Sequence, residues 1–322
     1  MATTTNSRPA PGSRHTRSKK NRPRRSLLLV VLIVALAIGI VGGGFVIGSH
    51  LASAPTSTES SSALPAQPTA SPPPTATLTP GAPADAGPFA AEFASLAAEL
   101  NAQVGIVVRP VGAGPTPVTG GEWTTGTAWS TIKVPLAIAG LRETEPPETT
   151  DAMRAAITQS DNEAAESIWE SLGDPETAAT KVEAVLAEAG APTAVESRKV
   201  RPEFTAFGQT AWSLSDQATF LSAAACDPRN QPIMDLMGHI APDQSWGLGG
   251  IPGAKFKGGW GPSPDGGYLV RQFGVIPVND GLAVVAVAVD PRSGAFDDGT
   301  QALTRIATWL QEHADLVPVG NC

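Results

Sequence analysis

The sequence contains little cysteine and little histidine, and this scarcity narrows the chemistry available to the protein. Its two cysteines, Cys226 and Cys322, are too few for a disulfide scaffold or a zinc site. Of its four histidines, only His239 and His313 lie in the part of the chain that can fold. His313 ends a predicted surface helix, where a cation suits the helix dipole, and His239 falls in a helical or loop segment. Because no Gly-x-Ser-x-Gly sequence occurs either, we reject a Ser-His-Asp triad, and we expect no metal and no cofactor.

Positive charge is also scarce outside the first residues. Eight of the 22 basic residues lie in residues 1–26, which hold no acidic residue. The rest of the chain is left with 14 basic residues against 30 acidic ones, a net charge of −16. That charge disfavours binding to nucleic acid or to an anionic membrane surface.

The first 48 residues have the pattern of a membrane anchor. Residues 1–26 are basic, and residues 27–48 are uncharged and almost wholly apolar. About 20 apolar residues cross a bilayer as a helix, whereas a signal-peptide core is usually about 7–15 residues long. We therefore predict a single-pass anchor in the cell membrane, with the basic N-terminus inside and the rest outside. Cleavage near Ala54, which would give a secreted protein, is the alternative.

A linker and one domain follow the predicted anchor. Residues 49–88 are mostly Pro, Ala, Ser and Thr, cannot bury enough apolar surface to fold, and predict a disordered, extended spacer. Residues 89–322 are long enough for one domain with a substantial core. Since this domain would lie in an oxidising compartment, we predict a Cys226–Cys322 disulfide, with two free thiols as the alternative.

The order of the predicted elements in this domain indicates an α+β fold. Thr150, Asp161 and Asp174 are predicted helix caps, and residues 191–212 show no periodicity and predict a long loop. An antiparallel sheet would be flanked by the terminal helices and interrupted by an all-helical insertion subdomain. Helices are predicted over 89–100 and 131–142, from the cap Thr150 through Ile157, from Asp161 to Gly173, from Asp174 to Gly190, and over 215–225 and 298–313. Strands are predicted over 103–109, 254–257, 268–277 and 282–290.

Ser130 and Lys133 form a Ser-x-x-Lys pair at the start of a predicted buried helix. One helical turn separates them, so both side chains face the same way. An amine that burial keeps partly neutral can take the proton of a serine hydroxyl. Free N–H groups at a helix start can hold developing negative charge. Alone, the pair is a weak signal and fits a capped core helix better.

Two further motifs give the pair its meaning. Ser160-Asp161-Asn162 falls at a helix-to-helix corner, and Lys257-Gly258-Gly259 ends a predicted strand before a Gly-rich turn. In this order the three motifs resemble the Ser-x-x-Lys, Ser-Asp-Asn and Lys-Thr-Gly motifs of class A β-lactamases and penicillin-binding proteins. The resemblance covers nearly all of residues 90–315. It implies the β-lactamase-like fold, which agrees with the predicted order of elements.

The resemblance implies a role for each matching residue. Ser130 would attack the carbonyl of an amide or β-lactam, and Lys133 would accept or relay its proton. Ser160 would pass a proton to the departing nitrogen. Lys257 would supply positive charge for a substrate carboxylate, and Asn162 would bind the amide of the substrate's side chain.

The resemblance also implies an oxyanion hole, and it offers a candidate for binding the substrate carboxylate. The backbone N–H of Ser130 would form half of an oxyanion hole, and a strand N–H just beyond Gly259, near Gly261, would form the other half. Arg271, on the following strand, could hold the substrate carboxylate bidentately. A strand-surface arginine without such a role is the alternative.

The sequence departs from the family's pattern at two places that bear on turnover. Gly258 stands where the family usually has Thr or Ser, which removes one hydroxyl from the carboxylate site. The family's Glu-x-x-Leu-Asn, whose Glu activates the deacylating water, has no clear counterpart. Glu196 falls nearest the expected place and Glu203 is the alternative, but neither is followed by Leu-Asn, and both read better as solvent-exposed loop acids.

The resemblance implies a serine hydrolase that forms an acyl-serine intermediate. Its substrate would be a β-lactam or a peptidoglycan-type peptide, and a D-Ala-D-Ala peptidase activity fits the same motifs. The departures at Gly258 and in the loop motivate an alternative, a non-hydrolytic penicillin-binding or sensor module that has lost efficient deacylation. We expect no nucleic-acid partner.

Overall fold

The structure is a computed structural model in which residues 87–264 and 266–322 are described. The predicted basic tail, the membrane anchor and nearly all of the predicted linker lie outside the described residues. Among the helices of the described part, none combines the length and apolar character that a membrane crossing needs.

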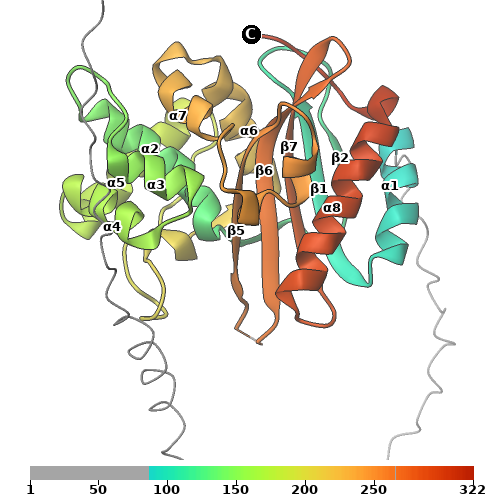
Figure 1. The fold of residues 1–322 in the computed structure, drawn as a ribbon, viewed down its shortest axis with the longest axis horizontal. Helices are drawn as coiled ribbons and strands as arrows, with labels where there is room; N and C mark the ends of the chain where they lie inside the picture. Colours follow the sequence, from blue (N-terminus) through green and yellow to red (C-terminus); the bar gives the residue numbers. More distant parts are fainter. Residues whose placement is uncertain (1–86, 265) are drawn as a thin grey trace, which may run out of the picture. The chain divides into compact units, whose positions relative to one another are not determined.

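The domain is built on a five-stranded antiparallel sheet with the strand order β2-β1-β7-β6-β5 (Figure 1). Its central strand β7 is buried on both faces along nearly its whole length, which explains its run of Val and Ala residues. In the register of the centre, Val107 of β1 and Phe273 of β6 both pair with Ala286 of β7. The strands are β1 (Ala102–Pro110), β2 (Val118–Gly121), β5 (Lys255–Pro262), β6 (Tyr268–Val278) and β7 (Gly281–Pro291).

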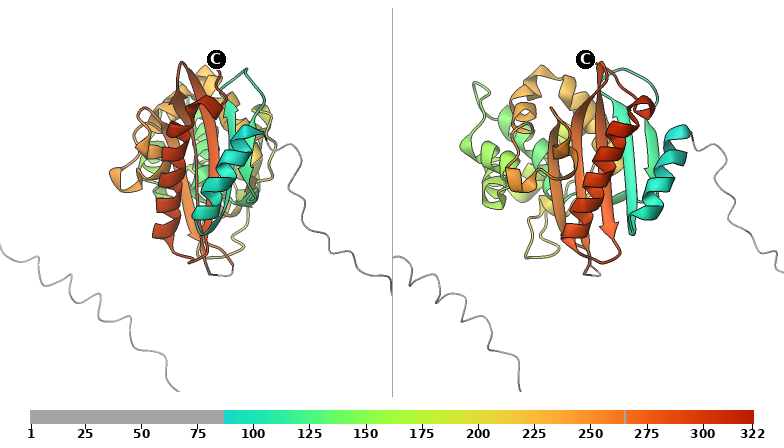
Figure 2. Two further views of the ribbon diagram at one scale, coloured as in Figure 1. Left: turned by 90° about the vertical axis from the view of Figure 1, so that its right-hand side faces the viewer. Right: turned by 45° about the vertical axis from the view of Figure 1, so that its right-hand side comes forward.

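The two terminal helices, α1 (Pro88–Glu99) and α8 (Phe296–Glu312), lie side by side across one face of the sheet (Figure 2). Phe89 and Phe93 of α1 meet the ring of Trp309 on α8 edge-on, at centroid distances of 5.3 and 5.4 Å. This apolar contact joins the beginning and the end of the domain. Both helices were predicted within two residues of their observed bounds.

The remaining helices pack on the opposite face of the sheet or beside it (Figure 1). Helix α6 packs directly on β1, β6 and β7, and α2 is buried along nearly its whole length. The predicted α+β fold, an antiparallel sheet with flanking terminal helices and a helical insertion, is confirmed. The helices are α2 (Lys133–Arg142), α3 (Asp151–Thr158), α4 (Asn162–Ser171), α5 (Pro175–Glu188), α6 (Leu214–Cys226) and α7 (Gln231–Leu236).

The predicted helix caps are confirmed. The side chains of Thr150, Asp161 and Asp174 each accept a hydrogen bond from the backbone N–H three residues on, at 3.2, 2.8 and 2.9 Å. Each bond satisfies one of the free N–H groups at the start of α3, α4 or α5. The cap at Asp161 matters most, because it fixes the corner that carries Ser160 and Asn162.

The strand pattern differs from the prediction in three respects, the first of which is the edge strand β2, which was not predicted. Strand β5 continues to Pro262, so Lys257 lies inside the strand, and the predicted Gly-rich turn after it is wrong. Two short strands, β3 (Thr125–Thr127) and β4 (Ala211–Ser213), pair with each other, so the predicted loop over 191–212 ends in a strand. Strands of three residues carry too little periodicity to be recognised in a sequence.

The two cysteines are joined in the structure. A disulfide links Cys226, the last residue of α6, to Cys322, and their Cα atoms are 5.3 Å apart. The bridge encloses a long loop, since 96 positions separate the two residues. It therefore attaches the end of the chain to the helical layer.

Removing this bridge is expected to lower the free energy of unfolding by about 2–4 kcal/mol, because a cross-link that closes a long loop restricts the unfolded chain. Chemical denaturation of the native protein and of the Cys226→Ser/Cys322→Ser variant would measure the difference. Mass spectrometry that finds both thiols alkylated without prior reduction would rule the bridge out.

Candidate functional site

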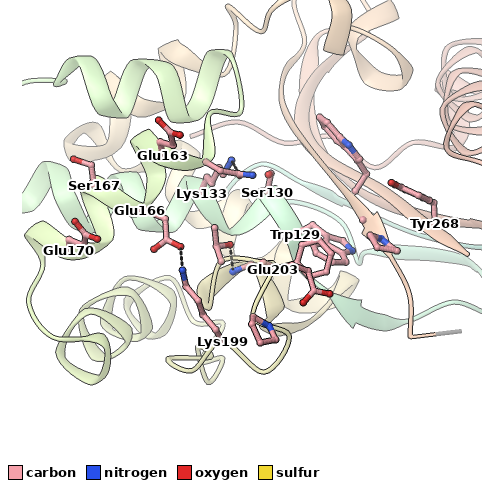
Figure 3. Close-up of a pocket in the computed structure, with 18 residues that line it drawn as sticks. Trp129, Ser130, Lys133, Glu163, Glu166, Ser167, Glu170, Lys199, Glu203 and Tyr268 are labelled. Atoms are coloured by element: carbon pink, nitrogen blue, oxygen red, sulfur yellow. Dashed lines mark hydrogen bonds and ion pairs between the residues drawn. The ribbon is translucent and has the colours of Figure 1, made fainter. Parts of the chain in front are cut away.

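A pocket of about 590 Å³ opens where the helical layer meets the edge strand β5 (Figure 3). Ser130 and Lys133 lie at its centre, and Asn162 and further residues of α4 form one wall. The loop over residues 199–205 forms a second wall, and Trp260, Gly261 and Tyr268 form a third. The pocket thus contains the first motif and the asparagine of the second, while Ser160 and Lys257 do not line it.

Ser130 lies in a 3₁₀ turn, Trp129–Ile132, immediately before α2. The preceding residue, Trp129, has φ +50°, and Ser160 at the opposite corner has φ +57°. A bulky residue in this left-handed region is uncommon and costs free energy, so surrounding contacts must hold it there. The ring of Trp129 packs edge-on against Phe204 at 5.0 Å. Both unusual conformations occur at residues that position the motifs.

Lys133 is 1% exposed, and its Nζ donates to the carbonyl oxygen of Ser160 at 2.6 Å and to Oδ1 of Asn162 at 2.7 Å. A neutral amine has two N–H donors and one lone pair. The two carbonyl oxygens use both donors, so the lone pair stays available for a proton. Within the described residues the Ser130 hydroxyl makes no hydrogen bond and faces the pocket.

Lys257 lies behind Ser160 and completes the cluster. It is fully buried, and its Nζ donates to Oγ of Ser160 and to the carbonyl oxygen of Gly258, both at 2.8 Å. Oγ of Ser160 is also 3.5 Å from Nζ of Lys133. The serine hydroxyl therefore lies between the two amines, where it can relay a proton.

Burial governs the protonation of both lysines. It lowers the pKa of Lys133 to about 7, and the charge of Asp161 opposes this shift only in part. Burial, followed by repulsion from Lys133, lowers the pKa of Lys257 well below its ordinary value. No salt bridge to either lysine occurs in the described part of the chain. Lys133 is thus poised to exchange a proton near neutral pH.

The glycines of β5 allow the strand to pass close to the serine turn. A Cβ atom at Gly259 would lie 2.9 Å from the backbone nitrogen of Ser130, and one at Gly261 would lie 2.4 Å from the ring of Trp129. The expected oxyanion partner near Gly261 is therefore on a strand that contacts the serine turn directly. Gly258 faces the other way, where a Cβ would lie 3.1 Å from the Trp246 ring. The Trp246 ring therefore lies next to the position that a Thr or Ser side chain at residue 258 would take.

Arg271 does not hold a substrate carboxylate, which corrects the sequence-based hypothesis. Its guanidinium is fully buried and donates to the carbonyl oxygens of Gly126, Thr127 and Trp212 and to Oε1 of Gln217. Gln217 in turn donates to Oγ1 of Thr131, the residue after Ser130, at 2.8 Å. Arg271 is thus a structural residue that joins β3 and β4 to the serine turn. The sequence pattern predicts that Arg271 lies on a strand, but it does not predict that the side chain is fully buried.

Replacing Arg271 with methionine is expected to lower the free energy of unfolding by about 2–4 kcal/mol, because two buried and two partly buried acceptors lose their donor. Urea denaturation would measure the change. Arg305→Met is the matched control, since Arg305 is exposed and pairs with Glu99, and its effect should stay within about 0.5 kcal/mol. Equal losses in the two variants would contradict the structural role.

The structure separates the two candidate loop acids. Glu196 accepts from the backbone N–H of Arg198 at 2.9 Å and from its guanidinium at 3.2 Å, and these contacts lower the pKa of its carboxyl. Glu196 does not line the pocket, so its assignment as a deacylation base is corrected. Glu203 lines the pocket and lies 3.6 Å from the guanidinium of Arg201.

Helix α4 contributes acids to the pocket that the sequence analysis missed. Glu163, Glu166 and Glu170 line it, and Glu166 forms an ion pair of 3.0 Å with Lys199 of the loop (Figure 3). A signal for Glu166 was available, because it follows Asn162 by four positions and so lies on the same helical face. The aromatic wall formed by Trp260 and Tyr268 carried no such signal.

The two histidines of the domain take structural positions. Nδ1 of His239 is 2.9 Å from the carbonyl oxygen of Asp235, and His313 stacks on the ring of Trp309. Neither lines the pocket. Across residues 87–264 and 266–322, no group of three or more His, Cys, Asp or Glu residues is arranged to hold a metal ion.

The fold is similar to that of several solved structures. An ancestral class A β-lactamase (GNCA) matches with a TM-score of 0.55 at 19% identity, over 70% of this chain and 99% of that chain. The putative class A β-lactamase PenP from Rhodopseudomonas palustris gives a TM-score of 0.56 at 16% identity, over 70% and 99%. The TLA-3 extended-spectrum β-lactamase gives 0.56 at 13% identity, over 70% and 98%. No protein-family model and no curated protein sequence matches the chain. The domain therefore has the fold of the class A β-lactamases.

Proposed function

We propose that the domain is a serine hydrolase that forms an acyl-serine intermediate with a β-lactam or a peptidoglycan-type peptide. The observation that carries this proposal is that Ser130 and Lys133 line one pocket, and that Lys133 and Lys257 both contact Oγ of Ser160. These residues supply a pocket-facing hydroxyl, an amine with a free lone pair, and a second hydroxyl held between two amines. The β-lactamase-like fold supports the same reading. Residues 27–48 would anchor this domain outside the cell membrane.

Acylation would proceed by one attack and two proton transfers. Nζ of Lys133 takes the proton of Ser130, whose Oγ attacks the carbonyl carbon of the amide. Backbone N–H groups of Ser130 and of β5 stabilise the resulting oxyanion. The C–N bond then breaks, and the nitrogen receives a proton through Oγ of Ser160, which Lys257 orients and Lys133 can resupply. The acyl group stays on Ser130.

Deacylation is where the second candidate function enters, a penicillin-binding or sensor module with slow turnover. The specific observation in its favour is the position of Glu196, outside the pocket and bonded to its own loop. General-base help typically contributes about 10²–10⁴-fold to a rate. Without it, a burst of product equal to the enzyme present would be followed by a much slower steady rate.

A fluorescent penicillin tests the proposal directly. The full chain is incubated with the probe, the excess is removed, and the label is located by peptide mass spectrometry and followed in time. Label on Ser130 that decays quickly supports a β-lactamase, and label that persists supports the slow-turnover module. Absence of label on Ser130 at millimolar probe would contradict the proposal for β-lactams, and a D-Ala-D-Ala peptide assay would then decide for peptides.

Glu196→Gln is expected to change the steady rate of penicillin turnover by less than about twofold, because a carboxylate outside the pocket cannot activate water at the ester. Steady-state hydrolysis after the burst is the measurement. Glu203→Gln and Glu166→Gln are the comparisons, since both acids line the pocket. A fall of about 100-fold for Glu196→Gln with an intact burst would reverse this assignment.

A further inference from the structure

The wall of the pocket formed by α4 is negatively charged. Glu163, Glu166, Ser167 and Glu170 all line the pocket, and their spacing of three, four and seven positions places them on one helical face (Figure 3). The loop opposite adds Glu203. Four carboxylates therefore surround a pocket of about 590 Å³.

Few positive charges oppose these carboxylates. Lys199 pairs with Glu166 at 3.0 Å, and Arg201 lies 3.6 Å from Glu203. Within the described residues Glu163 and Glu170 have no ion-pair partner. Burial lowers the pKa of Lys133 and of Lys257, so each contributes less positive charge to the pocket than an ordinary lysine would. The α4 wall thus carries uncompensated negative charge.

A substrate would reach this wall in a defined direction. Asn162, expected to bind the amide of the substrate's side chain, is the first residue of α4, and its Nδ2 has no partner within the described residues. A group attached beyond that amide would therefore continue along α4, past Glu163, Glu166 and Glu170. A positive charge there would be attracted, and a negative one repelled.

The other walls suit a cation as well. Trp260 and Tyr268 line the pocket, and aromatic faces attract ammonium groups, whereas the Phe204 ring already has the guanidinium of Arg201 over it at 4.4 Å.

We propose that the pocket selects acyl donors whose side chain, beyond the amide, carries an ammonium group, as an amine-bearing peptide stem does. This inference rests on the proposed acylation of Ser130 and adds its substrate class. It also explains how a strongly acidic domain can accept substrate, because a cationic side chain is attracted to a negative pocket mouth.

Ampicillin and carbenicillin test the proposal, because they are the same penicillin except at one side-chain carbon. Ampicillin carries an ammonium group there, and carbenicillin carries a carboxylate. Intact-mass kinetics with the full chain would give the second-order rate constant for acylation of each. We expect ampicillin to react about tenfold faster at low salt. The preference should fall towards unity at 1 M salt, where the screening length is about 3 Å.

The charge variants decide which residues are responsible. Glu163→Gln/Glu170→Gln should reduce the preference to about twofold or less. The matched control is Glu92→Gln/Glu312→Gln, which removes the same charge from exposed residues outside the pocket and should keep the tenfold preference. Equal rates for the two penicillins, or an unchanged preference in the α4 variant, would overturn this inference while leaving the acylation of Ser130 intact. Failure of both penicillins to acylate Ser130 would overturn the proposed function itself.

Discussion

Ser130→Ala is expected to abolish covalent labelling by a penicillin, with a loss of acylation on the order of 10⁴-fold or more, because no other group takes the place of the attacking oxygen. The fold should be unaffected. The Ser130 hydroxyl makes no hydrogen bond in the described structure and does not cap the helix, so the free energy of unfolding should change by no more than about 0.5 kcal/mol. Intact-mass spectrometry and thermal unfolding measure the two effects.

Ser167→Ala provides the matched control for this experiment. Ser167, on α4, is a second serine that lines the same pocket. Its variant should be labelled like the native protein. Undiminished acylation of Ser130→Ala would end the interpretation of this domain as a serine enzyme, and labelling lost in Ser167→Ala instead would move the nucleophile to α4.

Lys133→Ala is expected to be nearly as inactive as Ser130→Ala, and the double variant should be no worse than either, because residues that act as one unit are not additive. Lys133→Arg separates charge from proton transfer, since a guanidinium keeps the charge but does not give up its proton. It should be inactive as well. Acylation that survives in Lys133→Arg would place the proton acceptor elsewhere.

The pH profile of acylation gives an independent measure of the same residue. Burial lowers the pKa of Lys133 to about 7. A base acts only when deprotonated, so the acylation rate should rise with pH through about 7 and then level off. Lys199→Ala, which removes a pocket lysine on the loop, should keep this profile. A flat profile between pH 5 and 9 would contradict the role of Lys133.

The fold could be predicted largely because its signals are local and repeated. The caps at Thr150, Asp161 and Asp174 fix three helices of the insertion, and the apolar faces of α1 and α8 fix the terminal layer. Each of these depends on residues within a turn or two of one another. The short strands β3 and β4 depend instead on a pairing of positions about 86 apart, such as Gly126 with Trp212, which leaves no local pattern.

The sequence identified the motif residues of the site, but it did not identify the residues that form the walls of the pocket. Lys133 and Lys257 both contact Oγ of Ser160, and Ser130 lines the same pocket as Lys133, while the catalytic roles of these residues stay predictions. The depth of Arg271 could not be foreseen, because a polar residue on a strand is equally compatible with a surface position. Likewise, the sequence could not show whether the Glu196 side chain faces the pocket. In the structure it accepts a hydrogen bond from the backbone N–H of Arg198 instead.

The buried lysines have a consequence for how this domain can change over generations. Lys133 and Lys257 are buried without a salt-bridge partner in the described structure. Burying an amine without an acidic partner lowers the stability of the folded state. Apolar side chains of similar volume would fit the same space at lower cost. Selection for a sturdier domain alone would therefore remove both amines. Both amines are nevertheless present, one on either side of one serine hydroxyl. We infer that they were kept because function requires them, at a cost in stability.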